Sequence, residues 1–305
     1  MYSFDIIGDI HGHAEELIQL LEKLGYKDRN GFEHPTRRVL FLGDLIDRGP
    51  RVREVLRIVK WMTQKGSARV IMGNHEYNII CYYTKYQNEY LRRHVPKNQR
   101  QNEMTRQAFE GREDEWQEWL DWLKKLPLFF ECEEFRAVHA AWDQQKINHI
   151  QEVLSDGQLT DDFLIRSVQM GNLEYKIVEM LLKGQELSLP DGTEYPDKDG
   201  HNRSTIRVKW WSPLKGKTYQ EALFPQGNKV PDLPIPQLLI NEDISYQKQL
   251  RPVFFGHYWL QGKPYLQQKN VACLDYSVAN NGKLMAYRFD GEASLKSEKF
   301  VWISG

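Results

Sequence analysis

The sequence has little cysteine, no long apolar run and almost no net charge, and each absence excludes a class of protein. Its three cysteines, Cys81, Cys132 and Cys273, form no CxxC pair, so a disulfide framework or a cysteine zinc site is not expected. No apolar stretch approaches the roughly 18 residues that a membrane span needs. Lys and Arg (41) nearly balance Asp and Glu (42), which argues against stable DNA binding through bulk charge.

The sequence also shows no targeting segment. Residues 1–5 contain no basic region followed by an apolar run, so no signal peptide is expected. With 41% hydrophobic and 27% charged residues, the composition is globular rather than disordered or collagenous. A chain of 305 residues can build a sizeable core. We therefore expect a compact cytoplasmic protein with no membrane partner.

The first third of the chain alternates strand and helix patterns. Apolar runs at residues 4–7, 39–42 and 69–72 are separated by segments 13–24 and 52–59, whose apolar residues recur at helical spacing. This order predicts a parallel sheet with crossover helices. In such sheets ligands bind beyond the carboxyl ends of the strands, so the residues that follow each run are the first candidates for a site.

The remainder of the chain is less regular. Further apolar runs lie at residues 135–138, 253–255, 271–274, 284–287 and 300–302. Residues 280–282 (Asn-Asn-Gly) predict a hairpin turn that joins the runs 271–274 and 284–287. The polar stretch 77–115, rich in Tyr, Arg and Gln, is predicted to be a helical excursion.

No linker, internal repeat or low-complexity tract divides the sequence. We therefore predict a single catalytic domain over residues 1–305, with insertions at about 77–130 and 143–207.

Three polar clusters follow the first three predicted strands, and two histidines, His139 and His257, end later ones. The clusters are Gly8-Asp9-Ile10-His11-Gly12, Gly43-Asp44-Leu45-Ile46-Asp47-Arg48-Gly49 and Gly73-Asn74-His75-Glu76. Because Asp9 and His11 are two residues apart, extended backbone places both on one face, where they can reach one ion. Mixed carboxylate, imidazole and amide donors suit a divalent transition metal such as Mn, Fe or Zn. A carboxylate shared by two ions is typical of a centre for phosphoryl transfer.

Each piece taken alone has a simpler interpretation. A single Asp after a strand is more often a helix cap than a metal ligand, and a single buried histidine is more often structural. Three clusters in order, each after an apolar strand pattern, make coincidence a poor explanation.

The clusters GDIHG, GDLIDRG and GNHE, followed by His139 and by Gly256-His257, resemble the PPP-type metallophosphatases of the calcineurin-like metallophosphoesterase superfamily. The resemblance runs from Phe4 to about Asp290 and is strongest over the first 76 residues. It implies an α/β fold, in which a β-sandwich of two mixed sheets is flanked by helices and carries inserted helical and loop segments. It also implies two divalent metal ions at the edge of the sandwich, with Mn²⁺ expected and Fe, Zn or Co as alternatives.

The resemblance further implies a role for each matching residue. The implied metal ligands are Asp9 and His11 for the first ion, Asp44 for both ions, and Asn74, His139 and His257 for the second. A hydroxide that bridges the ions would attack phosphorus, and His75, oriented by Asp47, would protonate the leaving oxygen. Arg48 and Asn74 would contact the phosphate.

Two further positions bear on the resemblance. Trp259 stands where general phosphodiesterases carry the last histidine of a Gly-His-x-His run, which favours the PPP branch. Relatives also place a second arginine on the phosphate between the last two histidines. Arg207 is the candidate here and Arg203 is the rival, and an ordinary surface arginine is an equally good interpretation of either.

The motifs predict hydrolysis of a phosphate ester or anhydride without identifying what carries the phosphate. Residues 271–277 and 281–284 are similar to the strand-turn-strand ending of bacterial dinucleoside tetraphosphatases, which favours a nucleotide-type substrate such as a dinucleoside polyphosphate. Serine/threonine phosphoprotein phosphatases share the metal motifs. The opening cluster also resembles the phosphatase module of bacterial RNA-repair enzymes. A phosphoprotein or an RNA end therefore stays an alternative substrate.

An aromatic and basic stretch bears on the RNA alternative. Tyr82, Tyr83, Tyr86 and Tyr90 precede Arg92, Arg93, Lys97, Arg100 and Arg106. Such a stretch can stack bases and meet phosphates, although a solvated insertion whose tyrosines pack inward is the more frequent arrangement. A non-catalytic nucleotide sensor is the alternative of another class. It is disfavoured because every implied ligand is present, together with His75, Asp47 and Arg48.

Overall fold

Two mixed β-sheets form the centre of the molecule in a computed structural model that describes residues 3–28, 31–154, 157–196, 202–240 and 245–305. The strands of the first sheet are β1 (Ser3–Ile7), β4 (Arg37–Phe41), β5 (Ala68–Val70), β16 (Asp275–Tyr276), β17 (Lys283–Phe289) and β18 (Phe300–Ser304). Those of the second are β8 (Phe129–Glu131), β9 (Arg136–Val138), β14 (Val253–Phe255) and β15 (Val271–Cys273). The orders are β16-β17-β1-β4-β5, with β18 beside β17, and β15-β14-β9-β8.

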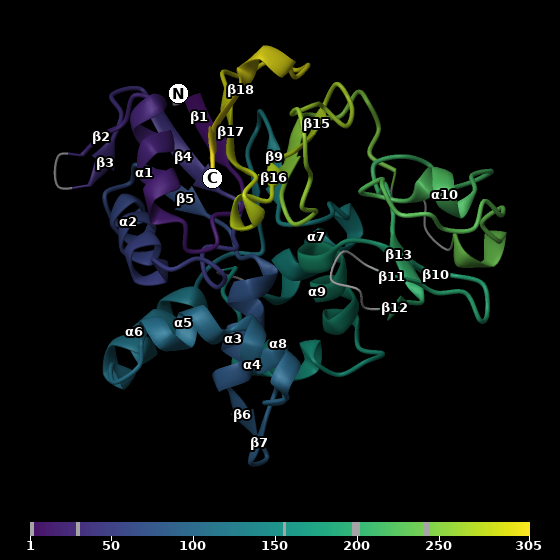
Figure 1. The fold of residues 1–305 in the computed structure, drawn as a ribbon, viewed down its shortest axis with the longest axis horizontal. Helices are drawn as coiled ribbons and strands as arrows, with labels where there is room; N and C mark the ends of the chain where they lie inside the picture. The colour runs from purple at the N-terminus through teal and green to yellow at the C-terminus, as the bar shows by residue number, and fades with distance from the viewer. Residues whose placement is uncertain (1–2, 29–30, 155–156, 197–201, 241–244) are drawn as a thin grey trace.

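The first sheet confirms the predicted βαβαβ order. β1, β4 and β5 are parallel, and the crossovers are the helices α1 (Ala14–Lys23) and α2 (Val52–Gln64). Leu17, Leu20 and Leu21 give α1 its buried stripe, and α1 ends just before Gly25, whose φ of 92° suits the left-handed position after a helix. Figure 1 shows α1 and α2 beside this sheet. The parallel strands therefore place the ends of β1, β4 and β5 at one edge.

The two sheets pack face to face through aromatic side chains. The ring centroids of Phe4 and Phe135 lie 5.3 Å apart, and Phe254 lies 5.1 Å from Tyr287 and 5.8 Å from Phe289. Each pair joins the first sheet to the second or to its adjoining residues. The fold expected from the resemblance, a β-sandwich of two mixed sheets flanked by helices, is thus confirmed.

One strand pairing differs from the sequence prediction. The hairpin that contains residues 280–282 joins β16 to β17, whereas the apolar run 271–274 supplies β15 of the other sheet. The chain passes from the second sheet to the first at Leu274, since β15 before it pairs with β14 and β16 after it pairs with β17. The predicted turn is confirmed, but the strand that pairs with β17 is β16 and not the apolar run 271–274.

The helices α3 to α9 lie below the sheets in Figure 1. They are α3 (Asn74–Tyr83), α4 (Pro96–Gln101), α5 (Glu103–Ala108), α6 (Glu113–Leu123), α7 (Gln144–Val153), α8 (Asp161–Ser167) and α9 (Leu173–Lys183). The predicted helical excursion at 77–115 is interrupted by a hairpin of β6 (Lys85–Tyr86) and β7 (Glu89–Tyr90). Gln87 and Asn88 at its tip have φ values of 49° and 66°, as a tight two-residue turn requires. Within the residues that the structure describes, no helix is long and apolar enough to cross a membrane.

A lobe formed by residues 186–196 and 202–240, to the right in Figure 1, has its own small hydrophobic cluster. Its elements are β10 (Glu186–Ser188), β11 (Tyr195–Pro196), β12 (Asn202–Arg203), β13 (Thr205–Arg207), α10 (Tyr219–Ala222) and the 3-10 turn η1 (Gln237–Leu239). Ile206, Val208 and Leu223 are buried within it. The remaining short elements are β2 (Lys27–Asp28), β3 (Phe32–Glu33), η2 (Val278–Asn280) and η3 (Ser297–Lys299).

Candidate active site

The loops after β1, β4 and β14 share an unusual backbone conformation. His11, Asp44, Asp47, Arg48 and His257 all have positive φ, between 47° and 73°. Residues other than glycine rarely adopt this region, and they are held there only when the surrounding structure imposes it. Backbone hydrogen bonds impose it here, since the His11 N–H donates to the Asp44 carbonyl at 2.8 Å.

Two glycines let these loops approach closely. A Cβ on Gly43, whose φ is 91°, would lie 2.3 Å from the backbone nitrogen of Gly73. A Cβ on Gly256 would lie 2.0 Å from Oδ1 of Asp9. The glycines of the sequence motifs therefore bring the second loop against the third and the last loop against the first.

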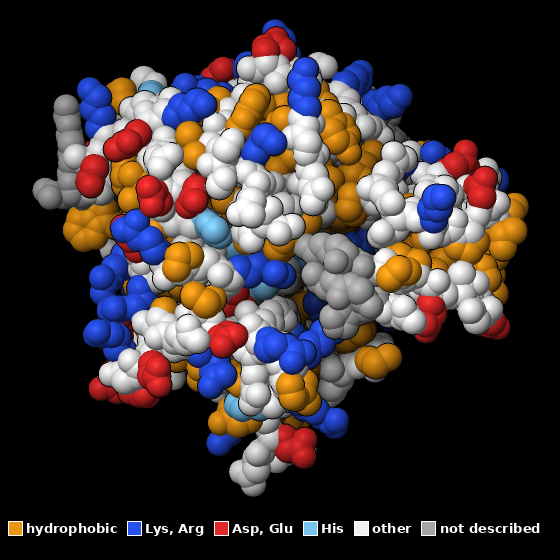
Figure 2. Space-filling view, viewed as in Figure 1, with side chains coloured by type: hydrophobic (Ala, Val, Ile, Leu, Met, Phe, Trp, Pro, Cys, Tyr) orange, Lys and Arg blue, Asp and Glu red, His pale blue; other side chains and the backbone are white. Residues whose placement is uncertain are grey.

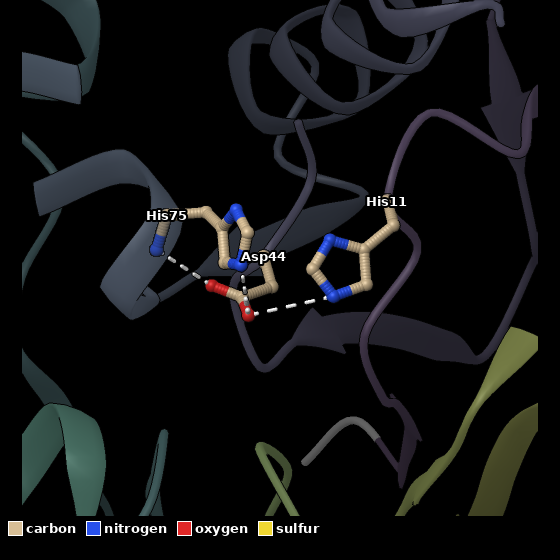
Figure 3. A group of neighbouring side chains, drawn as sticks. All are labelled: His11, Asp44 and His75. Atoms are coloured by element: carbon tan, nitrogen blue, oxygen red, sulfur yellow. Dashed lines mark hydrogen bonds and ion pairs between the residues drawn. The ribbon is translucent and has the colours of Figure 1, made fainter. Parts of the chain in front are cut away.

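Asp44 lies at the centre of the site and is almost fully buried. Its Oδ2 is 3.6 Å from Nε2 of His11, 3.4 Å from Nε2 of His139 and 4.0 Å from Nε2 of His75. Its Oδ1 accepts the backbone N–H of His75 at 2.9 Å. Figure 3 shows the imidazoles of His11 and His75 on either side of the Asp44 carboxylate.

Two groups of side chains are close enough to hold metal ions, and both contain Asp44. The first is His11, Asp44 and His75, and the second is Asp44, His139 and His257. Within each group the donor atoms lie within 4.8 Å of one another. Asn74 Oδ1 adjoins the second group, at 2.7 Å from Nδ1 of His257 and 3.1 Å from Nε2 of His139. Asp9 accepts the His257 backbone N–H at 3.1 Å, so its carboxylate lies beside the same group.

The protonation of the histidines fits a metal centre. Nδ1 of His11 donates to the Ile46 carbonyl at 3.0 Å, which leaves the lone pair of Nε2 facing Asp44. Burial lowers the pKa of His11 well below its usual value, and burial together with the charge of Arg207 does the same for His257. The buried Nε2 atoms of both rings have no hydrogen-bond partner among the described residues. Neutral imidazoles with free lone pairs are the form in which histidine ligates metals.

His139 shows that the centre attracts positive charge. Although burial alone would lower the pKa of His139, the carboxylate of Asp44 raises it to about 10. Conversely, burial and the charge of Asp275 raise the pKa of Asp9 well above its usual value. A divalent cation between these groups would replace the proton on His139 and stabilise the ionised form of Asp9. The donor set and its charge therefore fit two divalent cations.

Beside the metal groups, His75 and Asp47 form a buried pair. Nδ1 of His75 donates to Oδ2 of Asp47 at 2.6 Å, and both side chains are almost completely buried. Although burial lowers it, the carboxylates of Asp44 and Asp47 raise the pKa of His75 above its usual value. The arrangement leaves Nε2 of His75 directed toward Asp44 and able to hold a proton.

Glu76 is a site residue to which the sequence analysis gave no role. Its fully buried carboxylate accepts backbone N–H groups from Asp44 at 2.7 Å, Leu45 at 2.8 Å and Gly73 at 2.9 Å. One side chain thus ties the second loop to the third. A carboxylate in the first turn of a helix is ordinarily interpreted as a helix cap. The sequence therefore did not indicate that Glu76 also bonds the loop after β4.

Asp275 was also missed. It is buried beside Asp9, and its carboxylate accepts the backbone N–H groups of Trp259 at 2.7 Å and Ser277 at 3.0 Å. It therefore fixes the loop that contains His257. The signal in the sequence is a single acidic residue within the apolar stretch 271–278.

The predicted phosphate-binding arginines lie at the margin of the site. The guanidinium of Arg48 is exposed and lies 4.2 Å above the ring of Trp259, which in turn is 5.7 Å from the ring of His11. Arg207, half-buried on β13, is close enough for its charge to lower the pKa of His257, whereas Arg203 on β12 is exposed. Figure 2 shows Lys and Arg side chains around a hollow near the middle of this face. The structure thus brings Arg207 toward the metal groups.

The tyrosines of the aromatic and basic stretch are largely engaged with their own neighbours. His94 is stacked between Tyr82 at 3.7 Å and Tyr90 at 4.0 Å, and Tyr83 packs on Trp116 at 5.6 Å. Tyr82 is buried, whereas Tyr83, Tyr86 and Tyr90 remain exposed, so the stretch keeps aromatic surface in solvent.

Comparisons with known proteins agree with the geometry. The model of the family described as calcineurin-like phosphoesterase matches residues 2–257. A bis(5'-nucleosyl)-tetraphosphatase PrpE (asymmetrical) of Halalkalibacterium halodurans is 51% identical over 74 residues, which are 24% of this chain and 30% of that protein. A symmetrical bis(5'-nucleosyl)-tetraphosphatase of Buchnera aphidicola is 43% identical over 83 residues, 27% of each chain. These matches thus span less than a third of either relative.

Among solved structures, a protein serine/threonine phosphatase from Saccharomyces cerevisiae aligns over 99% of this chain and 79% of its own. Its sequence identity is 14% and its TM-score is 0.49. This likeness is too distant to support a statement about activity.

Proposed function

Because the chain belongs to the calcineurin-like phosphoesterase family, we propose that it is a metal-dependent phosphatase that hydrolyses a phosphate ester or anhydride. The observation that carries the proposal is the position of buried Asp44 between two proposed ligands, since its Oδ2 lies 3.6 Å from Nε2 of His11 and 3.4 Å from Nε2 of His139. Two divalent ions bound there would stabilise the charge on the phosphoryl oxygens and lower the pKa of a bound water toward neutrality.

The proposed ligands are the residues that the resemblance implies. They are Asp9, His11, Asp44, Asn74, His139 and His257. All are buried at one edge of the sandwich, and together they offer carboxylate, amide and imidazole donors. Such a mixed set suits Mn²⁺, which we propose as the working ion, with Fe, Zn or Co as alternatives.

His75 is the proposed general acid. Its bond to Asp47 fixes Nδ1 as a donor, so Nε2 is the atom that holds the proton for the leaving oxygen. Asp47 orients the ring and stabilises its cationic form. Although burial lowers it, the carboxylates of Asp44 and Asp47 raise the pKa of His75 above its usual value, which favours the protonated ring.

Arg48, Arg207 and Asn74 are the proposed phosphate-binding residues. The stacking of Arg48 on Trp259 restricts a long side chain that would otherwise be free in solvent. Arg207 comes from a separate part of the chain, on β13. A guanidinium offers paired donors to phosphate oxygens, so two of them can grip one phosphoryl group.

A dinucleoside polyphosphate is the proposed substrate class. The relatives at 51% and 43% identity are named for this activity, which supports the same substrate class here. A phosphoprotein and an RNA end remain the alternatives. We also propose a cytoplasmic location and a single domain with insertions at about 77–130 and 143–207.

Product analysis by mass spectrometry tests the proposal. The purified protein, loaded with Mn²⁺, is incubated with diadenosine tetraphosphate and a phosphoserine peptide in one tube, and Asp44→Asn serves as the control. Formation of two ADP, or of ATP and AMP, by the wild type alone supports the dinucleotide substrate. An intact dinucleotide beside a dephosphorylated peptide moves the protein to the phosphoprotein phosphatases. Binding of the dinucleotide without turnover identifies a sensor.

A further inference from the structure

Thr105, in the middle of α5, reaches the catalytic pair from a separate part of the chain. Its side chain is completely buried. Its Oγ1 accepts the backbone N–H of Asp47 at 3.0 Å and donates to Oδ1 of the same residue. The two residues are 58 positions apart, so an inserted helix supplies the hydroxyl that bonds both the backbone N–H and Oδ1 of Asp47.

These contacts form a continuous chain to the proposed acid. Oδ1 of Asp47 is held by Thr105, and Oδ2 accepts Nδ1–H of His75 at 2.6 Å. Asp47 also has a φ of 67°, a conformation that a non-glycine residue keeps only under constraint. Because Thr105 bonds both the backbone and the carboxylate of Asp47, it fixes the peptide and the side-chain rotation together.

The position of Thr105 is set independently of the strand-end loops. Asn102, at the start of α5, is completely buried, and the ring of Phe109 after its end packs on Trp116 at 4.6 Å. Phe109 also lies under the guanidinium of Arg53 on α2, at 5.8 Å. Within the insertion α5 packs against α6, and it contacts α2 of the core, so the Thr105 hydroxyl is held in place.

We propose that Thr105 is a positioning residue for general-acid catalysis. It holds Asp47 in the orientation that receives Nδ1–H of His75, and so keeps Nε2 of His75 aimed at the leaving oxygen. This inference rests on the proposed phosphatase function and adds to it a role for the inserted helix.

The dependence on leaving group tests the proposal. Thr105→Val keeps the shape and removes the hydroxyl, and Thr105→Ser keeps the hydroxyl. With β-glycerophosphate, whose alkoxide must be protonated, we expect kcat to fall about tenfold or more in Thr105→Val, with KM unchanged. With p-nitrophenyl phosphate, whose phenolate leaves without a proton, the loss stays below about threefold. Thr105→Ser restores kcat for both substrates.

A matched control and a readout without turnover complete the test. Thr84→Val removes a hydroxyl that donates to the Ile80 carbonyl in the same insertion, and it should leave both rates unchanged. By proton NMR, the downfield resonance of the proton between His75 and Asp47, identified by its absence in His75→Asn, should weaken in Thr105→Val and persist in Thr105→Ser.

The outcomes separate the two proposals. Equal losses for both substrates, or an unchanged resonance in Thr105→Val, would overturn the role of Thr105. If Thr105→Val does not fold, Thr105→Ala is measured in the same way. If the wild type hydrolyses neither of these substrates nor diadenosine tetraphosphate, the phosphatase function fails, and the resonance alone decides whether Thr105 orders the pair.

Discussion

The site is assembled from two kinds of segment that differ in how they are constrained. The loops after the parallel strands are locked by backbone hydrogen bonds, close glycine contacts and Glu76, and they supply Asp9, His11 and Asp44. The inserted segments rest on the core through their own aromatic contacts and supply Thr105 and Arg207. The proposed metal ligands Asp9, His11 and Asp44 therefore lie on the sheet, whereas Thr105 and Arg207 reach the site from the inserted segments.

Asp44→Asn is expected to have the largest effect, because Asp44 belongs to both donor groups. An amide carries no negative charge, so at least one ion is lost. We expect kcat/KM for phosphate release to fall about a thousandfold or more, the equivalent of roughly 4 kcal/mol. Asp290→Asn, at the opposite end of β4, is the control. Activity within tenfold of the wild type in Asp44→Asn would contradict the shared site.

Glu76→Ala tests whether one carboxylate holds the loops together. It leaves three buried N–H donors, those of Asp44, Leu45 and Gly73, without their acceptor. We expect the free energy of unfolding to fall by about 3 kcal/mol, measured by urea unfolding. The free energy of unfolding of Glu76→Gln, which retains one acceptor oxygen, should lie between that of Glu76→Ala and that of the wild type. The control Glu118→Ala replaces an exposed residue and should change the free energy of unfolding by less than about 0.5 kcal/mol. A loss in Glu118→Ala equal to that in Glu76→Ala would refute the role of Glu76.

Arg207→Ala tests whether an inserted segment contributes to phosphate binding. A half-buried guanidinium near His257 should contribute about 1.4 kcal/mol to phosphate binding, so we expect KM to rise about tenfold with little change in the unfolding midpoint. Arg203→Ala is the matched control and should stay within about twofold. A larger effect from Arg203 would reverse the assignment.

Asp290→Asn probes the end of the sheet remote from the site and should have the smallest effect. Although partial burial would raise it, hydrogen bonds from Lys299 and Arg37 hold the pKa of Asp290 at about 2. A lowered carboxyl pKa stabilises the fold above the unfolded pKa, and this contribution is lost as pH falls toward 2. Because the side chain is 48% exposed, we expect a loss below about 1 kcal/mol at pH 7.

The pH dependence checks that sign. The free energies of unfolding of the wild type and Asp290→Asn, measured with urea, should become more similar as pH falls below about 4. A difference that widens in acid would contradict the ion pairs as its source.

Much of the sheet and the candidate site could be predicted from sequence. The apolar runs at 4–7, 39–42 and 253–255 are strands, and the polar residues that follow the first two meet at one edge because β1 and β4 are parallel neighbours. The two-sheet sandwich followed from the family resemblance rather than from periodicity. The roles of individual residues remain predictions that the geometry supports.

The rest could not be predicted, because long-range contacts leave no local period. Thr105 lies in a polar helix and bonds Asp47 across 58 residues, a separation that no sequence pattern marks. Asp275 lies in a two-residue strand that the apolar run before it obscured, which is also why the partner of β17 was predicted wrongly. Contacts of this kind are set by tertiary packing alone.

The most direct test of the central claim is native mass spectrometry of the protein titrated with Mn²⁺. The shared Asp44 predicts two ions per chain in the wild type, two in Arg48→Ala and no more than one in Asp44→Asn. A wild-type chain that binds a single ion, or an Asp44→Asn chain that keeps two, would contradict it.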